Sequence, residues 1–206
     1  MNLFLLTGYF LAGVAAGWLL PCFCGPVPAF CRTVSSLLTG FLFMFAGLHV
    51  HPGFRLVLVW VFMCSLLLEA CIDLRYMIIP DEILLVLAAA GVLRVWFDNT
   101  GWQEAGLGSL TGIVLLGSVY LLSRGGLGLG DVKLAGALGP WLGVSGTVVH
   151  LARAFLFGGI AAIVLCIGGK GSMKSRIPFG PFLGLGAFLS FFYSARILAW
   201  YWSRFL

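Results

Sequence analysis

Residues 54–73 read FRLVLVWVFMCSLLLEACID, and this stretch determines the fold class. No charged residue interrupts it between positions 56 and 68. A helix needs about 20 apolar residues to cross the hydrocarbon core of a bilayer, and this run has that length. Apolar and polar residues do not alternate as they would in a half-buried strand. The stretch therefore predicts a transmembrane helix that ends at an aspartate, Asp73.

Composition extends this interpretation to the whole chain of 206 residues. Hydrophobic residues make up 61% of it and charged residues 9%, whereas a soluble domain carries roughly 25% charged residues. Lipid requires every backbone polar group to be satisfied internally, so only helical bundles and closed barrels span it. Because the apolar runs do not alternate, we predict an all-α, polytopic transmembrane helix bundle that forms a single domain over residues 1–206.

We expect about eight spans, or seven if the Gly-rich sixth is short or re-entrant. The expected spans cover residues 3–20, 34–50, 54–72, 81–97, 107–123, 132–148, 151–168 and 180–202. Pro140 is expected to kink the sixth. Eight spans place both termini on one side, and the loops on the other side hold seven of the twelve Lys and Arg residues. The positive-inside rule therefore places both termini outside and loops 73–81 and 123–132 in the cytoplasm.

Charge and cysteine patterns exclude other classes of protein. The net charge of +5 comes from basic residues scattered singly near span ends, without a basic stripe. This pattern does not indicate a nucleic-acid partner. Cys22, Cys24 and Cys31 share one short loop, but zinc sites favour four ligands in paired CxxC motifs. We therefore expect no metal and no cofactor, and we expect the lipid bilayer as a partner.

Two aspartates stand at the edges of predicted spans: Asp73 in ACIDLRYMIIPDEI and Asp131 in GGLGLGDVKLAGALGPWLG. An ionised carboxylate at membrane depth costs several kcal/mol, so it usually marks a functional site. The expected topology puts both on the same side. Two neighbouring carboxylates share one proton, so the ionised member activates water while the protonated member polarises a peptide carbonyl. The pattern predicts an aspartic protease, and which aspartate holds the proton stays open.

Simpler roles remain open for these residues. Asp73 and Asp131 each stand two positions before a base, Arg75 or Lys133, and ordinary ion pairs are the alternative to a dyad. Intramembrane acids also serve proton- or cation-coupled transporters, although such acids are expected near mid-span in chains with repeat symmetry. Glu69, one helical turn before Asp73, either tunes the pair or bonds to a neighbouring helix.

Residues beside the aspartates have expected supporting roles. Gly128 and Gly130 carry no side chain, so they leave room beside Asp131 for an extended substrate strand. Pro80 is typical of a helix start, and Asp81 is then expected as an N-cap or first-turn acid.

Three segments resemble the type IV prepilin peptidases, a bacterial and archaeal family of membrane aspartic proteases of the GxGD type. IDLRYMIIPDEI resembles the first aspartate box of that family, and GLGLGDVKLAGALGPWLG resembles the second. IPFGPFLGLGAF (177–188) resembles the segment that opens the last helix. The resemblance implies that Asp73 and Asp131 are catalytic. It assigns supporting places to Pro80, Asp81, Gly128, Gly130, Lys133, Pro178, Phe179, Gly180 and Pro181.

The resemblance also implies a reaction. Members of the family cleave the leader peptide of type IV prepilins or of pilin-like type II secretion subunits, at the cytoplasmic face of the bacterial inner membrane. We therefore expect prepilins or pseudopilins as substrate partners. The long form of the family carries a cytosolic insertion with two CxxC pairs, which accompanies N-methylation of the product. Only residues 21–33 occupy that place here, so we expect no N-methyltransferase activity.

Overall fold

The computed structural model describes residues 3–24, 29–98, 101–123, 126–168 and 177–205. Within these ranges the chain forms helices joined by short turns and contains no strand, which confirms the predicted all-α class. The helices are α1 (Leu3–Leu19), the short 3-10 helix η1 (Leu20–Cys24), α2 (Ala29–His49), α3 (Phe54–Tyr76), α4 (Asp81–Asp98), α5 (Trp102–Leu122), α6 (Leu129–Ile167) and α7 (Gly180–Phe205). Four of the basic residues that decided the expected orientation lie outside the described ranges: Arg124, Lys170, Lys174 and Arg176.

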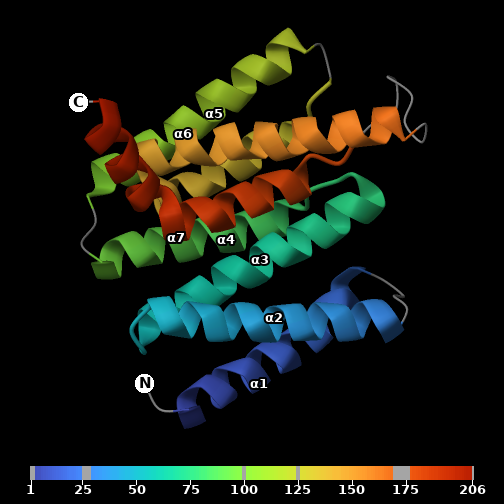
Figure 1. Cartoon of the computed structure of the whole chain (residues 1–206), viewed down its shortest axis with the longest axis vertical. Helices are drawn as coiled ribbons and strands as arrows, with labels where there is room; N and C mark the ends of the chain where they lie inside the picture. The colour runs from blue at the N-terminus through green and yellow to red at the C-terminus, as the bar shows by residue number, and fades with distance from the viewer. Residues whose placement is uncertain (1–2, 25–28, 99–100, 124–125, 169–176, 206) are drawn as a thin grey trace.

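Six of the described helices are long and apolar enough to cross a membrane, namely α1, α2, α3, α5, α6 and α7. The chain is therefore a multi-pass membrane protein. In α4, 18 residues long, Asp81 and Glu82 occupy the first turn, and Arg94 and Asp98 lie near the last. These charges lower its mean hydropathy without interrupting the apolar middle. In Figure 1, α4 lies beside α3, and the axes of the two helices run in roughly the same direction across the view.

α6 consists of two helices joined by a sharp reversal at Gly143. If it were straight, its 39 residues would span about 58 Å, nearly twice the ~30 Å hydrocarbon core. Gly143 has φ 64° and ψ −173°, a combination that is essentially restricted to glycine. Before the reversal, α6 packs on α5, where Gly139 faces Ser109. After it, α6 returns along α7, and the Phe155 ring lies 5.2 Å from that of Phe179, centroid to centroid.

The reversal corrects the boundary between two expected spans. We expected a kink at Pro140 and a break between residues 148 and 151, but the break follows Leu142, and the two halves cover residues 129–142 and 144–167. With α6 counted as two segments, the seven α-helices that the structure describes give eight helical segments. Six of the seven helices are long and apolar enough to cross a membrane, so the number of eight spans stays a prediction. Both termini lie on the left in Figure 1, at the same end of the helix axes.

The core of the bundle lies between α3, α4, α6 and α7. Trp141 of α6 is central to it, because its indole Nε1 donates to the Leu87 carbonyl of α4 at 2.9 Å. Its ring also packs against Phe62 of α3, with 4.6 Å between the ring centroids. α1 and α2 form a hairpin at the edge of the bundle, beside α3 (Figure 1). This packing brings together the end of α3 and the starts of α6 and α7.

Charged side chains satisfy the backbone groups that the reversal of α6 leaves unpaired. A buried polar group without a partner costs about 1–3 kcal/mol, so a broken helix needs substitutes for its lost hydrogen bonds. Arg94 of α4 donates to the Trp141 carbonyl at 2.7 Å. On the other side of Gly143, the Glu104 carboxylate of α5 accepts the Val144 N–H at 3.3 Å. The reversal is thus held by one side chain from each neighbouring helix.

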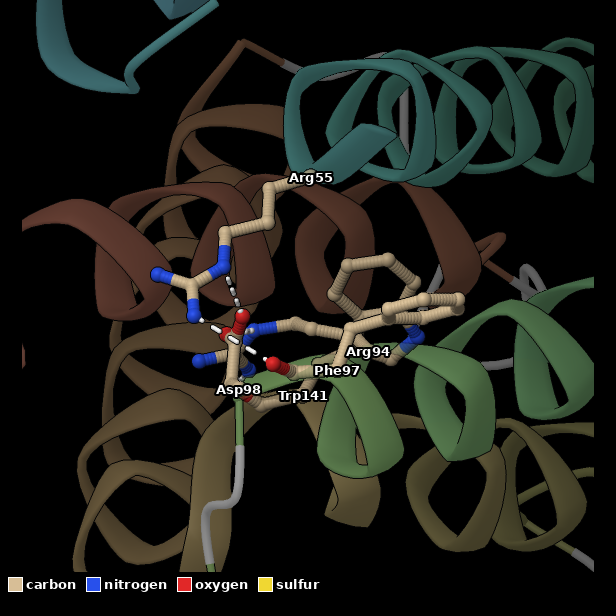
Figure 2. Close-up of polar contacts among 5 residues, drawn as sticks. All are labelled: Arg55, Arg94, Phe97, Asp98 and Trp141. Carbon is tan, nitrogen blue, oxygen red and sulfur yellow. Dashed lines mark hydrogen bonds and ion pairs between the residues drawn. The ribbon is translucent and has the colours of Figure 1, made fainter. Parts of the chain in front are cut away.

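The same arginine belongs to a larger network, which Figure 2 shows. Arg94 pairs with Asp98 one turn later, and Asp98 also pairs with Arg55 at the start of α3. Arg55 donates in addition to the Phe97 carbonyl at 3.3 Å. These contacts tie α3, α4 and α6 together at the end of the bundle that holds the reversal.

Candidate active site

Asp73 lies in the last turn of α3 and is 5% exposed. Met77 ends that helix in the left-handed conformation, with φ 55° and ψ 38°, and its N–H donates to the Asp73 carbonyl at 2.9 Å. Glycine is the usual residue for this geometry, and a residue with a side chain is uncommon there. No feature of the sequence predicts a left-handed residue at position 77. The abrupt ending turns the chain into the segment 77–80 and keeps Asp73 at one end of the bundle.

Asp131 lies in the first turn of α6 and is 7% exposed. Its Oδ2 accepts the backbone N–H of Gly128, the N-cap residue, at 3.0 Å. A carboxylate in a first turn satisfies an otherwise unpaired N–H and faces the positive end of the helix dipole. The Gly-rich start of α6 therefore fixes the carboxyl group of Asp131 by local backbone geometry.

Gly128 and Gly130 matter because they lack a side chain and not because of unusual backbone angles. In the described part of the chain the glycines with positive φ are Gly53 and Gly143. A Cβ on Gly130 would lie 3.1 Å from the Cβ of Ile79, and one on Gly128 would lie 3.2 Å from Asp131 Oδ2. Gly130 thus lets the segment between α3 and α4 approach the start of α6.

The start of α7 completes the site. Gly180, its first residue, donates its N–H to Asp73 Oδ2 at 2.8 Å. A Cβ at that position would lie 2.7 Å from the same oxygen, so the contact requires glycine. Phe179 packs its ring against Phe155 of α6, and Pro181 lacks an N–H in the first turn, where helical N–H groups have no intrahelical partner. The Pro-Phe-Gly-Pro segment therefore anchors α7 and binds Asp73.

Asp73 and Asp131 line the same two cavities. The larger, about 480 Å³, opens toward residues 78–82 and Lys133. The smaller, about 260 Å³, opens toward residues 126–127 and 177–179. Met77 and Gly128 line both cavities together with the two aspartates. The structure therefore brings Asp73 and Asp131 to the same cavities, while their pairing as a dyad stays a prediction.

Lys133 binds Asp81 and not Asp131. Its Nζ lies 2.8 Å and 2.9 Å from the two carboxylate oxygens of Asp81. The alternative in which Lys133 pairs with Asp131 is thus wrong. Asp81 opens α4, as expected for a first-turn acid. Both side chains of the pair are more than half exposed, and such pairs contribute at most about 1 kcal/mol to stability.

Glu69 is the acid of this region that differs most from expectation. It faces Asp73 and the start of α7, and it is fully buried. Neither of its carboxyl oxygens has a hydrogen-bond partner among the described residues, so the expected bond to a neighbouring helix is not formed there. Within the same part of the chain, no group of three His, Cys, Asp or Glu side chains is placed to hold a metal ion.

The arrangement suits acid–base chemistry on a bound peptide. Backbone N–H groups, from Gly180 and Gly128, fix Asp73 and Asp131 without bringing a positive charge to either. Two such carboxyl groups at one cavity favour a state in which they share a proton. That state provides a base for water and an acid for a carbonyl oxygen at the same place.

Comparison with known proteins gives a consistent result. A model described as the type IV leader peptidase family matches residues 60–163. Curated relatives named prepilin leader peptidase/N-methyltransferase share 29% identity over 182 residues in Bacillus subtilis (strain 168), 32% over 181 in Aeromonas hydrophila and 30% over 202 in Dichelobacter nodosus. These matches cover 86%, 83% and 95% of this chain, and 72%, 61% and 67% of the relatives. No solved structure matches the chain.

The family match covers the part of the bundle that builds the site. It begins within α3 and ends in the second half of α6, so it includes both aspartates and the Gly-rich start of α6. The relatives extend the similarity over most of the remaining chain. The chain therefore belongs to the type IV leader peptidase family.

Proposed function

We propose that this protein is a membrane aspartic endopeptidase that removes the leader peptide from type IV prepilins or pilin-like secretion subunits. The observation that carries the proposal is that Asp73 and Asp131 line the same two cavities while their carboxyl groups are held by backbone amides. The relatives are named prepilin leader peptidase/N-methyltransferase, which supports the choice of substrate.

The proposed mechanism uses one shared proton. The ionised aspartate takes a proton from a water molecule, and the oxygen of that water attacks the carbonyl carbon of the scissile peptide bond. The protonated aspartate donates to the carbonyl oxygen and stabilises the tetrahedral intermediate. The carbon–nitrogen bond then breaks, and the leaving amine receives the proton that the first aspartate took from water. The pair returns to its starting state with one proton.

The substrate has to be extended where it meets the aspartates. The segment 77–80 on one side and Gly128 and Gly130 on the other line the larger cavity with little side-chain bulk from the α6 side. We propose that a substrate strand lies there, and that Lys133 and Asp81 hold the two walls at a fixed separation through their ion pair. Pro178 and Phe179 border the smaller cavity and would contact the other side of the strand.

We propose that the active site faces the cytoplasm from a bacterial inner membrane. The excess of Lys and Arg in the loops at this end supports that orientation. We also propose that the chain does not N-methylate its product by itself, because residues 21–33 offer no paired CxxC motifs. The transporter alternative expected acids near mid-span, whereas the two aspartates lie in a last and a first helical turn.

Coexpression with a candidate prepilin tests the proposal. The wild-type chain is expected to shorten the prepilin by the length of its leader, which gel mobility and mass spectrometry detect. Asp73→Asn and Asp131→Asn, together or singly, should each abolish the cleavage while insertion into the membrane is retained, because an amide is neither a base nor an acid. Efficient processing by either single variant would remove the dyad from the mechanism.

A further inference from the structure

Glu69 is a buried acid that the dyad mechanism does not use. It lies on α3 one turn before Asp73 and is 0% exposed. Neither carboxyl oxygen accepts a hydrogen bond from a described residue. A carboxylate buried without a partner is strongly disfavoured, by several kcal/mol, so the environment suits the neutral carboxylic acid. A neutral acid has one proton to donate, which needs an acceptor nearby.

The candidate acceptor is Asp73, on the same helix. Glu69 Oε1 and Asp73 Oδ2 both lie within 3 Å of the position that a Cβ on Gly180 would occupy, so these two oxygens are neighbours. Gly184 lies one turn further along α7 and leaves space beside Glu69 Oε2. A Cβ on Gly184 would lie 3.4 Å from that oxygen, which is an ordinary contact. The two glycines of α7 thus make room for a second acid next to Asp73.

The charged surroundings of Glu69 contain only acids in the part of the chain that the structure describes. Asp73 of α3 and Asp131 of α6 are the charged groups that act on Glu69. A second negative charge on Glu69 would oppose ionisation of both aspartates. A proton on Glu69, shared with Asp73, has the opposite effect, because a hydrogen bond to a carboxylate stabilises its ionised form.

We infer that Glu69 is a positioning residue that assigns the two roles within the dyad. It stays protonated and donates a hydrogen bond to the Asp73 carboxylate, which already receives the Gly180 N–H. Asp73 then has two donors, and Asp131 has the Gly128 N–H. Asp73 is therefore the ionised member that activates water, and Asp131 holds the shared proton and polarises the carbonyl. This inference rests on the proposed function of the dyad.

Two variants of Glu69 separate this role from a purely structural one. Glu69→Gln keeps a neutral hydrogen-bond donor of the same size, and Glu69→Leu keeps the bulk but removes the donor. With purified full-length protein and a recombinant prepilin, Glu69→Gln should retain kcat within about threefold, with an unchanged pH profile. Glu69→Leu should lower kcat on the order of 10-fold to 100-fold, the rate equivalent of one charge-assisted hydrogen bond.

The pH profile and KM give the decisive readouts. Loss of the donor makes Asp73 harder to ionise, so the acidic limb of the kcat profile should move to higher pH in Glu69→Leu, while KM stays unchanged. Thermal unfolding in detergent should show that Glu69→Leu is folded. The inference is overturned if folded Glu69→Leu keeps the wild-type kcat and acidic limb. It is equally overturned if Glu69→Gln is as inactive as Asp73→Asn, since Glu69 would then have to exchange its proton.

Infrared spectroscopy tests the protonation of Glu69 without any activity. At neutral pH the wild-type spectrum minus that of Glu69→Gln should contain the carbonyl band of a protonated carboxylic acid. Its absence would contradict the inference even if the enzyme cleaves prepilins. Conversely, if the wild-type protein cleaves no prepilin, the proposed function fails while the infrared band still decides the state of Glu69. The two failures are therefore distinguishable.

Discussion

Met77 combines an unfavourable backbone with a place beside both aspartates. The left-handed conformation costs a residue with a side chain about 1–2 kcal/mol relative to glycine, and Met77 adopts it with φ 55°. Its side chain lines both cavities of the site. Strain of this kind is found most often where a side chain has a functional place. Met77 therefore combines a strained backbone conformation with a place at both cavities of the candidate site.

Comparing Met77→Gly with Met77→Ala separates these two effects. Both variants lose the side chain, but only glycine relieves the backbone. Unfolding in detergent should show Met77→Gly to be more stable than Met77→Ala by about 1 kcal/mol. Both should cleave prepilin more slowly than the wild type. Equal stability of the two variants would show that the left-handed turn at the end of α3 is unstrained.

Gly180→Ala should inactivate the enzyme. The new Cβ would fall 2.7 Å from Asp73 Oδ2 and against the Glu69 carboxyl group, so Asp73 would have to move. Displacing a catalytic group by about 1 Å costs on the order of 100-fold in rate. Gly159→Ala on α6 is the matched control, because a Cβ there meets nothing within 4 Å. A cleavage rate for Gly180→Ala equal to that of the control would contradict the assigned contact.

The reversal within α6 is the element that sets where Asp131 lies. Gly143→Ala should destabilise the protein by about 1–3 kcal/mol, because its φ and ψ are essentially restricted to glycine. Denaturant titration in detergent measures this change. Gly106→Ala on α5, where a Cβ meets nothing within 4 Å, provides the control. If both variants unfold at the same denaturant concentration, the reversal does not depend on glycine at position 143.

The sequence predicted the elements better than their ends. Apolar runs of membrane length locate the helices, and the two aspartate boxes locate the site, because both signals are local. The position of the reversal is not a local property: no charged residue and no proline marks residues 141–149. The break is stabilised by Arg94 and Glu104 from other helices. The isolation of Glu69 likewise depends on Gly180 and Gly184 of α7, more than a hundred residues away.

At the scale of the whole molecule, the end of α3 and the starts of α6 and α7 lie opposite both termini (Figure 1). These helix ends hold Asp73, Asp131 and Gly180. The positive-inside bias predicts that this end is cytoplasmic. Single cysteines introduced at Gly126 and at Gly53, in a chain whose native cysteines are replaced, should test the orientation. An impermeant thiol reagent added outside intact spheroplasts should label position 53 and spare position 126. The reverse pattern would invert the topology.

The reversal at Gly143 also means that the length of the first half of α6 sets the direction in which Asp131 points. Each residue of an α-helix advances about 1.5 Å and rotates about 100°. Arg94 and Glu104 hold the chain on both sides of Gly143. The orientation of Asp131 about the helix axis therefore depends on the number of residues between it and Gly143. Deleting one residue between positions 134 and 142 would turn the carboxyl group of Asp131 by about 100° away from Asp73, although none of these residues lines the two cavities of the site. The relative orientation of the two aspartates therefore depends on the length of this helix as well as on its composition.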